Sequence, residues 1–208
     1  MFVREKIDAL YSYAGRTQIP LGHSLPTRIG GFGGATGLSD YIRDERITHV
    51  IDATHPFAAE MSRHAVEACA AADVPLVALE RAPWSRTTGD TWIEVADIAG
   101  AIDRLPEQSA RVFLAIGRQH IAPFAVKPQH AYTLRFVDAP DGTLPLPEAE
   151  LIVSRGPFTL EGDRELMRSR GIQWLVARNS GGTGARAKID AARELGLPVI
   201  MTPPAARQ

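Results

Sequence analysis

Short apolar runs alternate along the chain with segments in which apolar residues recur every three or four positions. Short runs bounded by Gly and Pro predict strands at residues 7–14, 49–53, 75–79, 91–95, 111–116, 131–137, 150–154, 173–177 and 198–201. The longer period predicts helices over residues 38–45, 58–72, 97–105, 160–170 and 185–195. Gly171 and Gly196 directly follow two of these helices, where C-capping glycines belong.

Several predicted strands are continuously apolar, such as V-I-D-A and V-F-L-A-I, as expected for strands buried on both faces. Strand–helix alternation then predicts an α/β fold with mostly parallel sheets. Nine strands are many for one sheet in 208 residues, so we expect two Rossmann-like lobes of four or five strands with a cleft between them. The predicted domains are 1–105 and 106–208, with 138–147 a long loop inside the second.

Composition narrows the class of protein. The formal net charge of −1 does not indicate a nucleic-acid-binding protein, and 20 of the 23 basic residues are Arg. One cysteine, Cys69, excludes an internal disulfide framework and fits a cytoplasmic location. No apolar run has the length of a membrane span, and the N-terminus lacks the apolar core of a signal peptide. There is no H-E-x-x-H or G-x-S-x-G motif, so we expect neither a catalytic metal nor a hydrolase nucleophile.

The loops that follow the predicted strands hold the candidate chemistry, because ligands of such folds bind beyond the carboxyl ends of the strands. Gly30–Gly34 precedes a helix and could bring backbone N–H groups to an anion, although a flexible turn explains it equally well. Residues 182–187 match G-x-G-x-x-A, but no acidic residue follows at the spacing of a dinucleotide site. An anion-binding helix N-terminus, with Lys188 one turn in, is the better interpretation.

Other candidates have ordinary alternatives. Arg16 could accept the 2′-phosphate of NADP or be a surface residue, and His55, held extended by the following proline, could be an acid or purely structural. Trp84 and Trp92 are interpreted as packing anchors. Three phenylalanines lie in or near strand-end loops, where they could line a large flat ligand or close the core: Phe57, Phe124 and Phe158.

Taken together and in this order, the motifs resemble the precorrin-6A reductase and cobalt-precorrin-6A reductase family of corrin biosynthesis. The matching pieces span nearly the whole chain: Y-S-Y-A-G-R-T at 11–17, R-I-G-G-F-G-G at 28–34, I-D-A-T-H-P-F-A at 51–58, I-G-R at 116–118, S-R-G-P-F-T at 154–159, R-N-S-G-G at 178–182 through Lys188, and G-L-P-V-I-M at 196–201. Arg178 stands where the family usually has Lys.

The resemblance implies an NADP-dependent oxidoreductase in cobalamin biosynthesis. It would bind NADPH and a tetrapyrrole polycarboxylate between two lobes, without a metal cofactor, and reduce one C=C bond of precorrin-6A. The implied cofactor-binding residues are Gly15, Arg16, Thr17, Gly31, Phe32, Gly33, Gly34, Thr54, His55 and Pro56. The implied substrate-binding residues are Arg118, Arg155, Gly156, Phe158, Asn179, Ser180, Gly181, Gly182 and Lys188. No catalytic residue is implied, no nucleic acid or membrane partner is expected, and a monomer is expected.

One departure from the family concerns the start of the chain. Family members have a strand, a Gly-Gly-Thr-type loop and a helix before the segment that begins here at Val3. We therefore expect a misassigned start and a longer natural protein, although a degenerate copy is an alternative. Two other functions stay open: a different NADPH-dependent reductase of the same fold, and a truncated protein that binds a tetrapyrrole or nucleotide without turnover.

Overall fold

The structure, a computed structural model, describes residues 8–14, 24–55, 57–140 and 142–203. The chain divides into two compact units, one containing residues 1–80 and the other residues 81–205. The division lies at Glu80/Arg81 and not near residue 105. The reason is that the strand at residues 92–94 and the helix that follows it belong to the sheet and core of the second unit.

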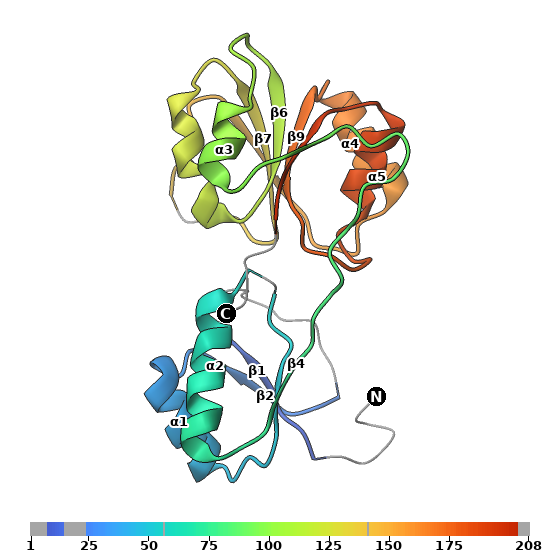
Figure 1. Ribbon diagram of the computed structural model, residues 1–208. Coiled ribbons are helices and arrows are strands. Elements are labelled where there is room, and N and C mark those ends of the chain that lie inside the picture. Colours follow the sequence, from blue (N-terminus) through green and yellow to red (C-terminus); the bar gives the residue numbers. More distant parts are fainter. Residues whose placement is uncertain (1–7, 15–23, 56, 141, 204–208) are drawn as a thin grey trace. The chain divides into compact units, whose positions relative to one another are not determined.

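In its described residues, the smaller unit contains two parallel two-stranded sheets and two helices (Figure 1). One sheet pairs β1 (Tyr11–Tyr13) with β2 (Thr27–Ile29), and the other pairs β3 (Val50–Asp52) with β4 (Leu76–Ala78). The helices are α1 (Gly34–Asp44) and α2 (Ala59–Ala72). Strand β2 was not predicted, because a run of three residues in which only Ile29 is apolar is too short to show a pattern.

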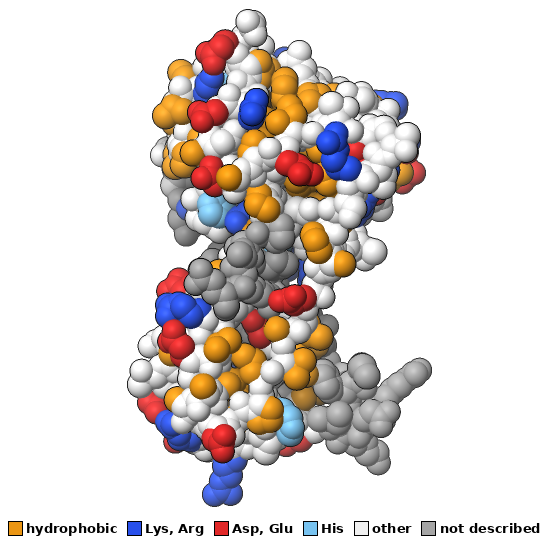
Figure 2. Space-filling model, in the orientation of Figure 1, with side chains coloured by type: hydrophobic (Ala, Val, Ile, Leu, Met, Phe, Trp, Pro, Cys, Tyr) orange, Lys and Arg blue, Asp and Glu red, His pale blue; other side chains and the backbone are white. Residues whose placement is uncertain are grey.

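The core of the smaller unit lies between the two helices and one face of the β3–β4 sheet. Leu38 and Ile42 of α1 pack with Ala65 and Ala68 of α2, and Val50 lies against this cluster. Ile51 and Val77 are register partners on the opposite face, and both are exposed. Figure 2 shows hydrophobic side chains at the surface of this unit. The prediction that strand β3 is buried on both faces was therefore wrong for the described residues, since helices cover only one face.

The larger unit is built on a six-stranded, fully parallel sheet with the order β5-β10-β9-β6-β7-β8. We expected four or five strands in this lobe, and its described residues form six. Their bounds are β5 (Trp92–Glu94), β6 (Arg111–Ala115), β7 (Ala131–Phe136), β8 (Ala149–Val153), β9 (Trp174–Arg178) and β10 (Val199–Thr202). The helical elements are α3 (Ile98–Asp103), α4 (Leu160–Ser169), α5 (Ala187–Glu194) and the 3₁₀ turns η1 (Arg118–His120) and η2 (Ala122–Val126).

Helices cover both faces of this sheet, as Figure 1 shows for α3 on one side and α4 and α5 on the other. Strand β6 contributes side chains to the cores on both faces, because successive side chains along a strand point to opposite faces of the sheet. Val112 and Leu114 lie in the cluster with α3 and η2, whereas Phe113 lies in the cluster with α4 and α5. All three are fully buried, which confirms the expectation for this strand.

Local sequence signals begin and end the helices of the larger unit. The Thr159 hydroxyl accepts a hydrogen bond from the Gly162 amide at 3.1 Å and caps α4, and Asp97 caps α3 through the Gly100 amide at 2.8 Å. Gly171 and Gly196 have φ angles of 58° and 66° just beyond α4 and α5. This left-handed conformation is the one that C-capping glycines supply.

Candidate functional site

The topology of the larger unit marks one end of its sheet as a ligand site. Strands β6 and β9 are neighbours at the centre. From β6 the chain proceeds to β7 and β8 on one side, whereas β9 leads to β10 on the other. The strand order therefore reverses between β6 and β9. In parallel α/β sheets, ligands bind beyond the carboxyl ends of the strands at such a switch point.

Two side chains bridge the switch point. Arg178 ends β9 and His120 lies in η1 after β6, and the Arg178 Nη1 and His120 Nε2 atoms are 2.6 Å apart. A guanidinium has only N–H donors, so Nε2 accepts and the neutral ring carries its hydrogen on Nδ1. Burial, and then the charge of Arg178, lowers the pKa of His120. His120 is therefore neutral at pH 7 and offers a donor at Nδ1.

The sequence analysis did not select His120. Two signals could have found it: the residue lies two positions after Arg118, and it follows a buried strand whose carboxyl end faces the switch point. Arg178 was noted only as a replacement for Lys. Arg118 itself lies in the same turn, on the surface.

Arg155 belongs to the loop that follows β8 at the same edge of the sheet. Its Nη2 atom lies 3.0 Å from Oδ1 of Asp138, which follows β7. The Arg155 side chain is 34% exposed, so an incoming carboxylate could compete with Asp138 for it. Three residues further on, the ring of Phe158 lies under the guanidinium of Arg135, 3.8 Å from ring centre to Cζ. Gly156, between them, is partly buried.

The predicted N-S-G-G loop after β9 is fixed by the segment around Trp84. The Asn179 amide accepts from the Trp84 backbone N–H and donates to its carbonyl, each at 2.8 Å. The Trp84 indole N–H donates to the Gly182 carbonyl at 2.6 Å. The Asn179 side chain is thus engaged by the protein, which favours a role in positioning the loop. Ser180 and Gly181 are buried beside it.

Lys188 lies in the first turn of α5, directly beyond this loop. The residue is 7% exposed, and Nζ donates to the Ala185 carbonyl at 2.7 Å. Burial, and then the charge of Arg135, lowers the pKa of Lys188 to about 8, while Asp163 raises it. Together with Arg118, Arg155 and Arg178, Lys188 gives the carboxyl edge of this sheet four cationic side chains.

In the smaller unit, the Gly-rich loop joins β2 to α1. Gly30, Gly33 and Gly34 have φ angles of 132°, 81° and 92°, and among the described residues no atom beyond the adjoining backbone lies within 4 Å of a Cβ built on any of them or on Gly31. Helix α1 begins at Gly34, four residues before the predicted start, and has no side-chain N-cap. Open space beside uncapped backbone N–H groups suits a phosphate or another anion.

Arg28 holds this loop in place from its carbonyl side. It donates to the carbonyls of Gly30 at 2.6 Å and Gly31 at 2.8 Å. Its guanidinium also lies over the ring of Phe32, 3.9 Å from the centroid. Since the carbonyls turn toward Arg28, the loop is preorganised while the N–H groups at the start of α1 stay uncapped by side chains. The residues present therefore fit a nucleotide phosphate.

Thr54 and His55 follow β3 in the same unit. The Thr54 amide donates to the buried Asp52 carboxylate at 3.0 Å, and its hydroxyl lies 3.3 Å from that of Ser62 in α2. His55 Nδ1 accepts from the Phe57 amide at 3.4 Å. Neither residue caps α2, whose N-cap position is Ala58. Four predicted cofactor residues lie outside the described part of the chain: Gly15, Arg16, Thr17 and Pro56.

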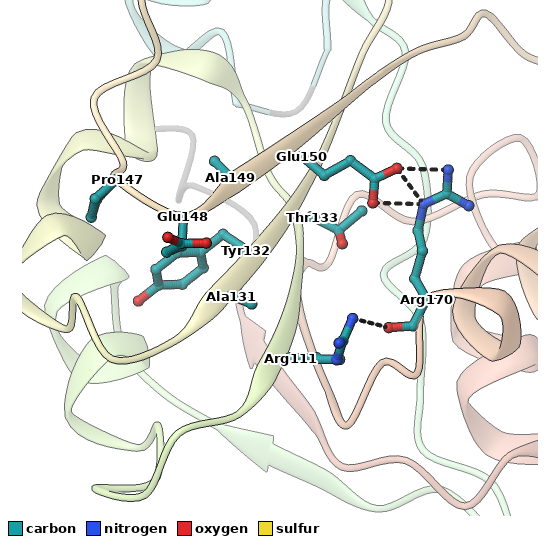
Figure 3. Close-up of a pocket in the computed structure, with 9 residues that line it drawn as sticks. All are labelled: Arg111, Ala131, Tyr132, Thr133, Pro147, Glu148, Ala149, Glu150 and Arg170. Atoms are coloured by element: carbon teal, nitrogen blue, oxygen red, sulfur yellow. Dashed lines mark hydrogen bonds and ion pairs between the residues drawn. The ribbon is translucent and has the colours of Figure 1, made fainter.

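A hollow of about 340 Å³ lies at the other end of the large sheet, where β6, β7 and β8 begin (Figure 3). Its two arginines are already engaged: Arg170 pairs with Glu150 at 2.8 Å, and Arg111 donates to the Arg170 carbonyl at 3.2 Å. Ligands of parallel α/β sheets bind beyond the carboxyl ends of the strands, whereas this hollow lies at their amino ends, so it is not our candidate. Among the described residues, no group of three His, Cys, Asp or Glu could hold a metal ion, and no helix is long and apolar enough to cross a membrane.

The fold and these loops define a doubly wound, parallel α/β protein with cationic strand-end loops. Comparison with known proteins gives the family. The family described as Precorrin-6x reductase CbiJ/CobK matches residues 1–206. The chain is 59% identical over 194 residues to the precorrin-6A reductase of Rhodobacter capsulatus, covering 93% of this chain and 77% of that protein. The chain belongs to the precorrin-6x reductase family.

Further relatives support the same family assignment. The precorrin-6A reductase of Mycobacterium tuberculosis is 43% identical over 196 residues, which cover 94% of this chain and 79% of that protein. The cobalt-precorrin-6A reductase of Priestia megaterium is 32% identical over 174 residues, 79% of this chain and 68% of that protein. A solved structure, CobK precorrin-6A reductase, superimposes with a TM-score of 0.93 at 57% identity, covering 96% of this chain and 79% of that chain. The resemblance and fold class predicted from the sequence are thereby confirmed.

Proposed function

We propose that the protein reduces one C=C bond of precorrin-6A, or of its cobalt-containing form, to the dihydro product in cobalamin biosynthesis, with NADPH as the reductant. NADPH supplies a hydride, and a proton completes the addition across the bond. Membership of the precorrin-6x reductase family is the observation that carries the proposal. The assignment of the smaller unit to NADPH and of the larger unit to the tetrapyrrole belongs to the same proposal.

The contribution of the larger unit follows from its charges. The proposed substrate carries many carboxylates, and Arg forks bind carboxylates in two parallel hydrogen bonds. Arg118, Arg155 and Arg178 follow or end three different strands on one edge, so they would contact separate carboxylates and fix the plane of the ring. Such alignment accounts for much of the rate of a hydride transfer, because the reacting carbon must lie close to the donor.

The contribution of the smaller unit would be to hold the cofactor. The proposed contacts are the backbone of Gly31, Phe32, Gly33 and Gly34, together with Thr54 and His55. Gly15, Arg16, Thr17 and Pro56 stay predictions of the same kind. The open space around the glycines and the uncapped start of α1 support this assignment.

The test is an anaerobic assay that follows NADPH oxidation with metal-free and cobalt-containing precorrin-6A, together with the mass of the product. We expect a gain of two hydrogens. Arg155→Gln should raise KM about tenfold or more, since a charged hydrogen bond is worth roughly 1.5–3 kcal/mol. Arg164→Gln is the control, because Arg164 of α4 pairs with Glu194 of α5 near the surface. Substrate binding without NADPH oxidation would contradict the reductase and favour a binding protein.

A further inference from the structure

A group of charged side chains lies inside the larger unit, beneath the strand-end loops. Arg135 on β7 forms an ion pair with Asp163 in the first turns of α4, and their side chains are only 8% and 3% exposed. Lys188 on α5 is 7% exposed, and the charges of both residues act on it. Two cations and one carboxylate thus share a buried region.

The pairing in this region is incomplete. Asp163 Oδ2 is buried and has no hydrogen-bond partner among the described residues. The Lys188 ammonium has three hydrogens, and its hydrogen bond to the Ala185 carbonyl uses one of them. The centre of the Trp84 ring lies 5.3 Å from Nζ. Within the described part of the chain, the ammonium of Lys188 is therefore a buried cation without a directly paired carboxylate.

Arg135 also connects this region to the surface loops. Its guanidinium contacts the ring of Phe158, with Cζ 3.8 Å from the ring centre, and lies 5.3 Å from the ring centre of Phe113. Phe158 belongs to the loop that carries Arg155, and Lys188 follows the loop that carries Ser180. Arg135 and Asp163 thus lie under two of the loops at the carboxyl edge.

We propose that Arg135 and Asp163 are positioning residues of the tetrapyrrole site, which together set the charge and orientation of Lys188 so that its ammonium can take one substrate carboxylate. The substrate part rests on the proposed function. The charged groups that act on Lys188 are Arg135 from β7 and Asp163 from α4. Neither of the two needs to touch the substrate.

The two residues act on Lys188 in opposite directions. The carboxylate of Asp163 favours the ammonium form, and the guanidinium of Arg135 disfavours it. Asp163→Asn should therefore lower the pKa of Lys188 below its value of about 8, and Arg135→Met should raise it. If Arg135 and Asp163 had a purely structural role, the two variants would not shift the pKa of Lys188 in opposite directions.

The chain allows a direct measurement, because it contains only three lysines, Lys6, Lys127 and Lys188. Labelling the lysine side chains with carbon-13 gives one resonance for each lysine. The resonance that is missing from the Lys188→Met variant is that of Lys188. We expect the titration midpoint of Lys188 to move down on the order of one pH unit in Asp163→Asn and up in Arg135→Met. Arg164→Met, which removes a surface charge on α4, should leave it unchanged.

Either single variant leaves a buried charge unpaired and could fail to fold. The double variant Arg135→Met/Asp163→Leu removes both charges together, which proteins tolerate better. Its Lys188 midpoint should lie between those of the two single variants. Equal midpoints in the folded variants and the wild type, or shifts in one direction only, would overturn the proposal.

A second readout links the charge to the substrate. KM for the tetrapyrrole should rise with pH as Lys188 loses its proton, and the pH of this rise should move with the midpoint of each variant while kcat changes less. A KM profile that stays fixed while the lysine titration moves would overturn the role in substrate binding. If the wild type reduces no tetrapyrrole at all, the proposed function fails, whereas the lysine titrations still test the role of Arg135 and Asp163.

Discussion

At the residue scale, the site depends on where ionisable groups are buried. Arg178 keeps His120 in one tautomer, and the interior lowers the pKa of Lys188 to about 8. Neither effect follows from residue type, since both groups have ordinary pKa values in water. Resemblance to the family implied substrate-binding roles for Lys188, Arg118 and Arg155, and these roles stay predictions. The sequence could not identify the partners Asp163, Arg135 and Asp138, which are far from them along the chain.

Another buried histidine gives a prediction about stability. His130 is 1% exposed, its Nδ1 accepts from the Ala110 amide at 3.2 Å, and burial and the nearby Lys127 lower its pKa. A neutral base with a lowered pKa stabilises the fold above the unfolded value of about 6.5, and this contribution is lost as the pH falls below that value. The protein should therefore lose stability between pH 7.5 and pH 5.5 partly through His130.

The variant His130→Asn keeps an acceptor for Ala110 but cannot take up a proton. We expect a smaller difference between the urea midpoints at the two pH values than in the wild type. Tryptophan fluorescence reports the larger unit alone, because Trp84, Trp92 and Trp174 all lie in it. An unchanged difference in His130→Asn would contradict the prediction.

At the scale of elements, loops and helix starts carry the site, and their geometry depends on a few glycines. From the sequence, the four glycines of the Gly-rich loop at residues 30–34 are compatible both with an anion site and with a flexible turn. The structure shows positive φ angles at three of these glycines and loop carbonyls that are hydrogen-bonded to Arg28. Both observations favour the anion site. The N-S-G-G loop is predicted to contact substrate, and the structure shows that its Asn179 amide is hydrogen-bonded to the Trp84 backbone.

A matched pair of glycine variants tests the importance of that loop. A Cβ on Gly181 would lie 2.4 Å from the Ala82 carbonyl oxygen at a φ of 64°, whereas nothing lies within 4 Å of a Cβ on Gly184. Gly181→Ala should lower the free energy of unfolding of the larger unit by on the order of 2 kcal/mol or more and weaken substrate binding. Gly184→Ala should do neither. Equal stability of the two variants, measured by urea unfolding, would contradict the close approach.

At the scale of the whole molecule, the chain consists of two compact units of unequal structure. The larger has a six-stranded sheet covered on both faces. The smaller has two short sheets, with Ile51 and Val77 exposed on one of them. Hydrophobic burial stabilises a domain in proportion to the apolar area it removes from water. The larger unit therefore has the core of an independently folding domain.

This difference predicts the behaviour of a fragment. Residues 81–208 alone should fold, show the tryptophan fluorescence of the full chain and unfold cooperatively at a similar temperature. Thermal unfolding followed by fluorescence and circular dichroism measures this. A fragment that lacks a cooperative transition would show that the larger unit depends on residues 1–80.

Sequence alone determined the alternation of strands and helices, the parallel α/β class and the family, because apolar period and local motifs are properties of neighbouring residues. It placed the domain boundary some 25 residues too late, since the pairing of β5 with β10 joins segments about a hundred residues apart. Only the tertiary structure decided which strand ends meet at the switch point, and which charges share the interior with Lys188. Sheet order brings together residues that are distant along the chain. Burial changes the free energy of a charged side chain, and the neighbouring residues in the sequence do not show whether that side chain is buried.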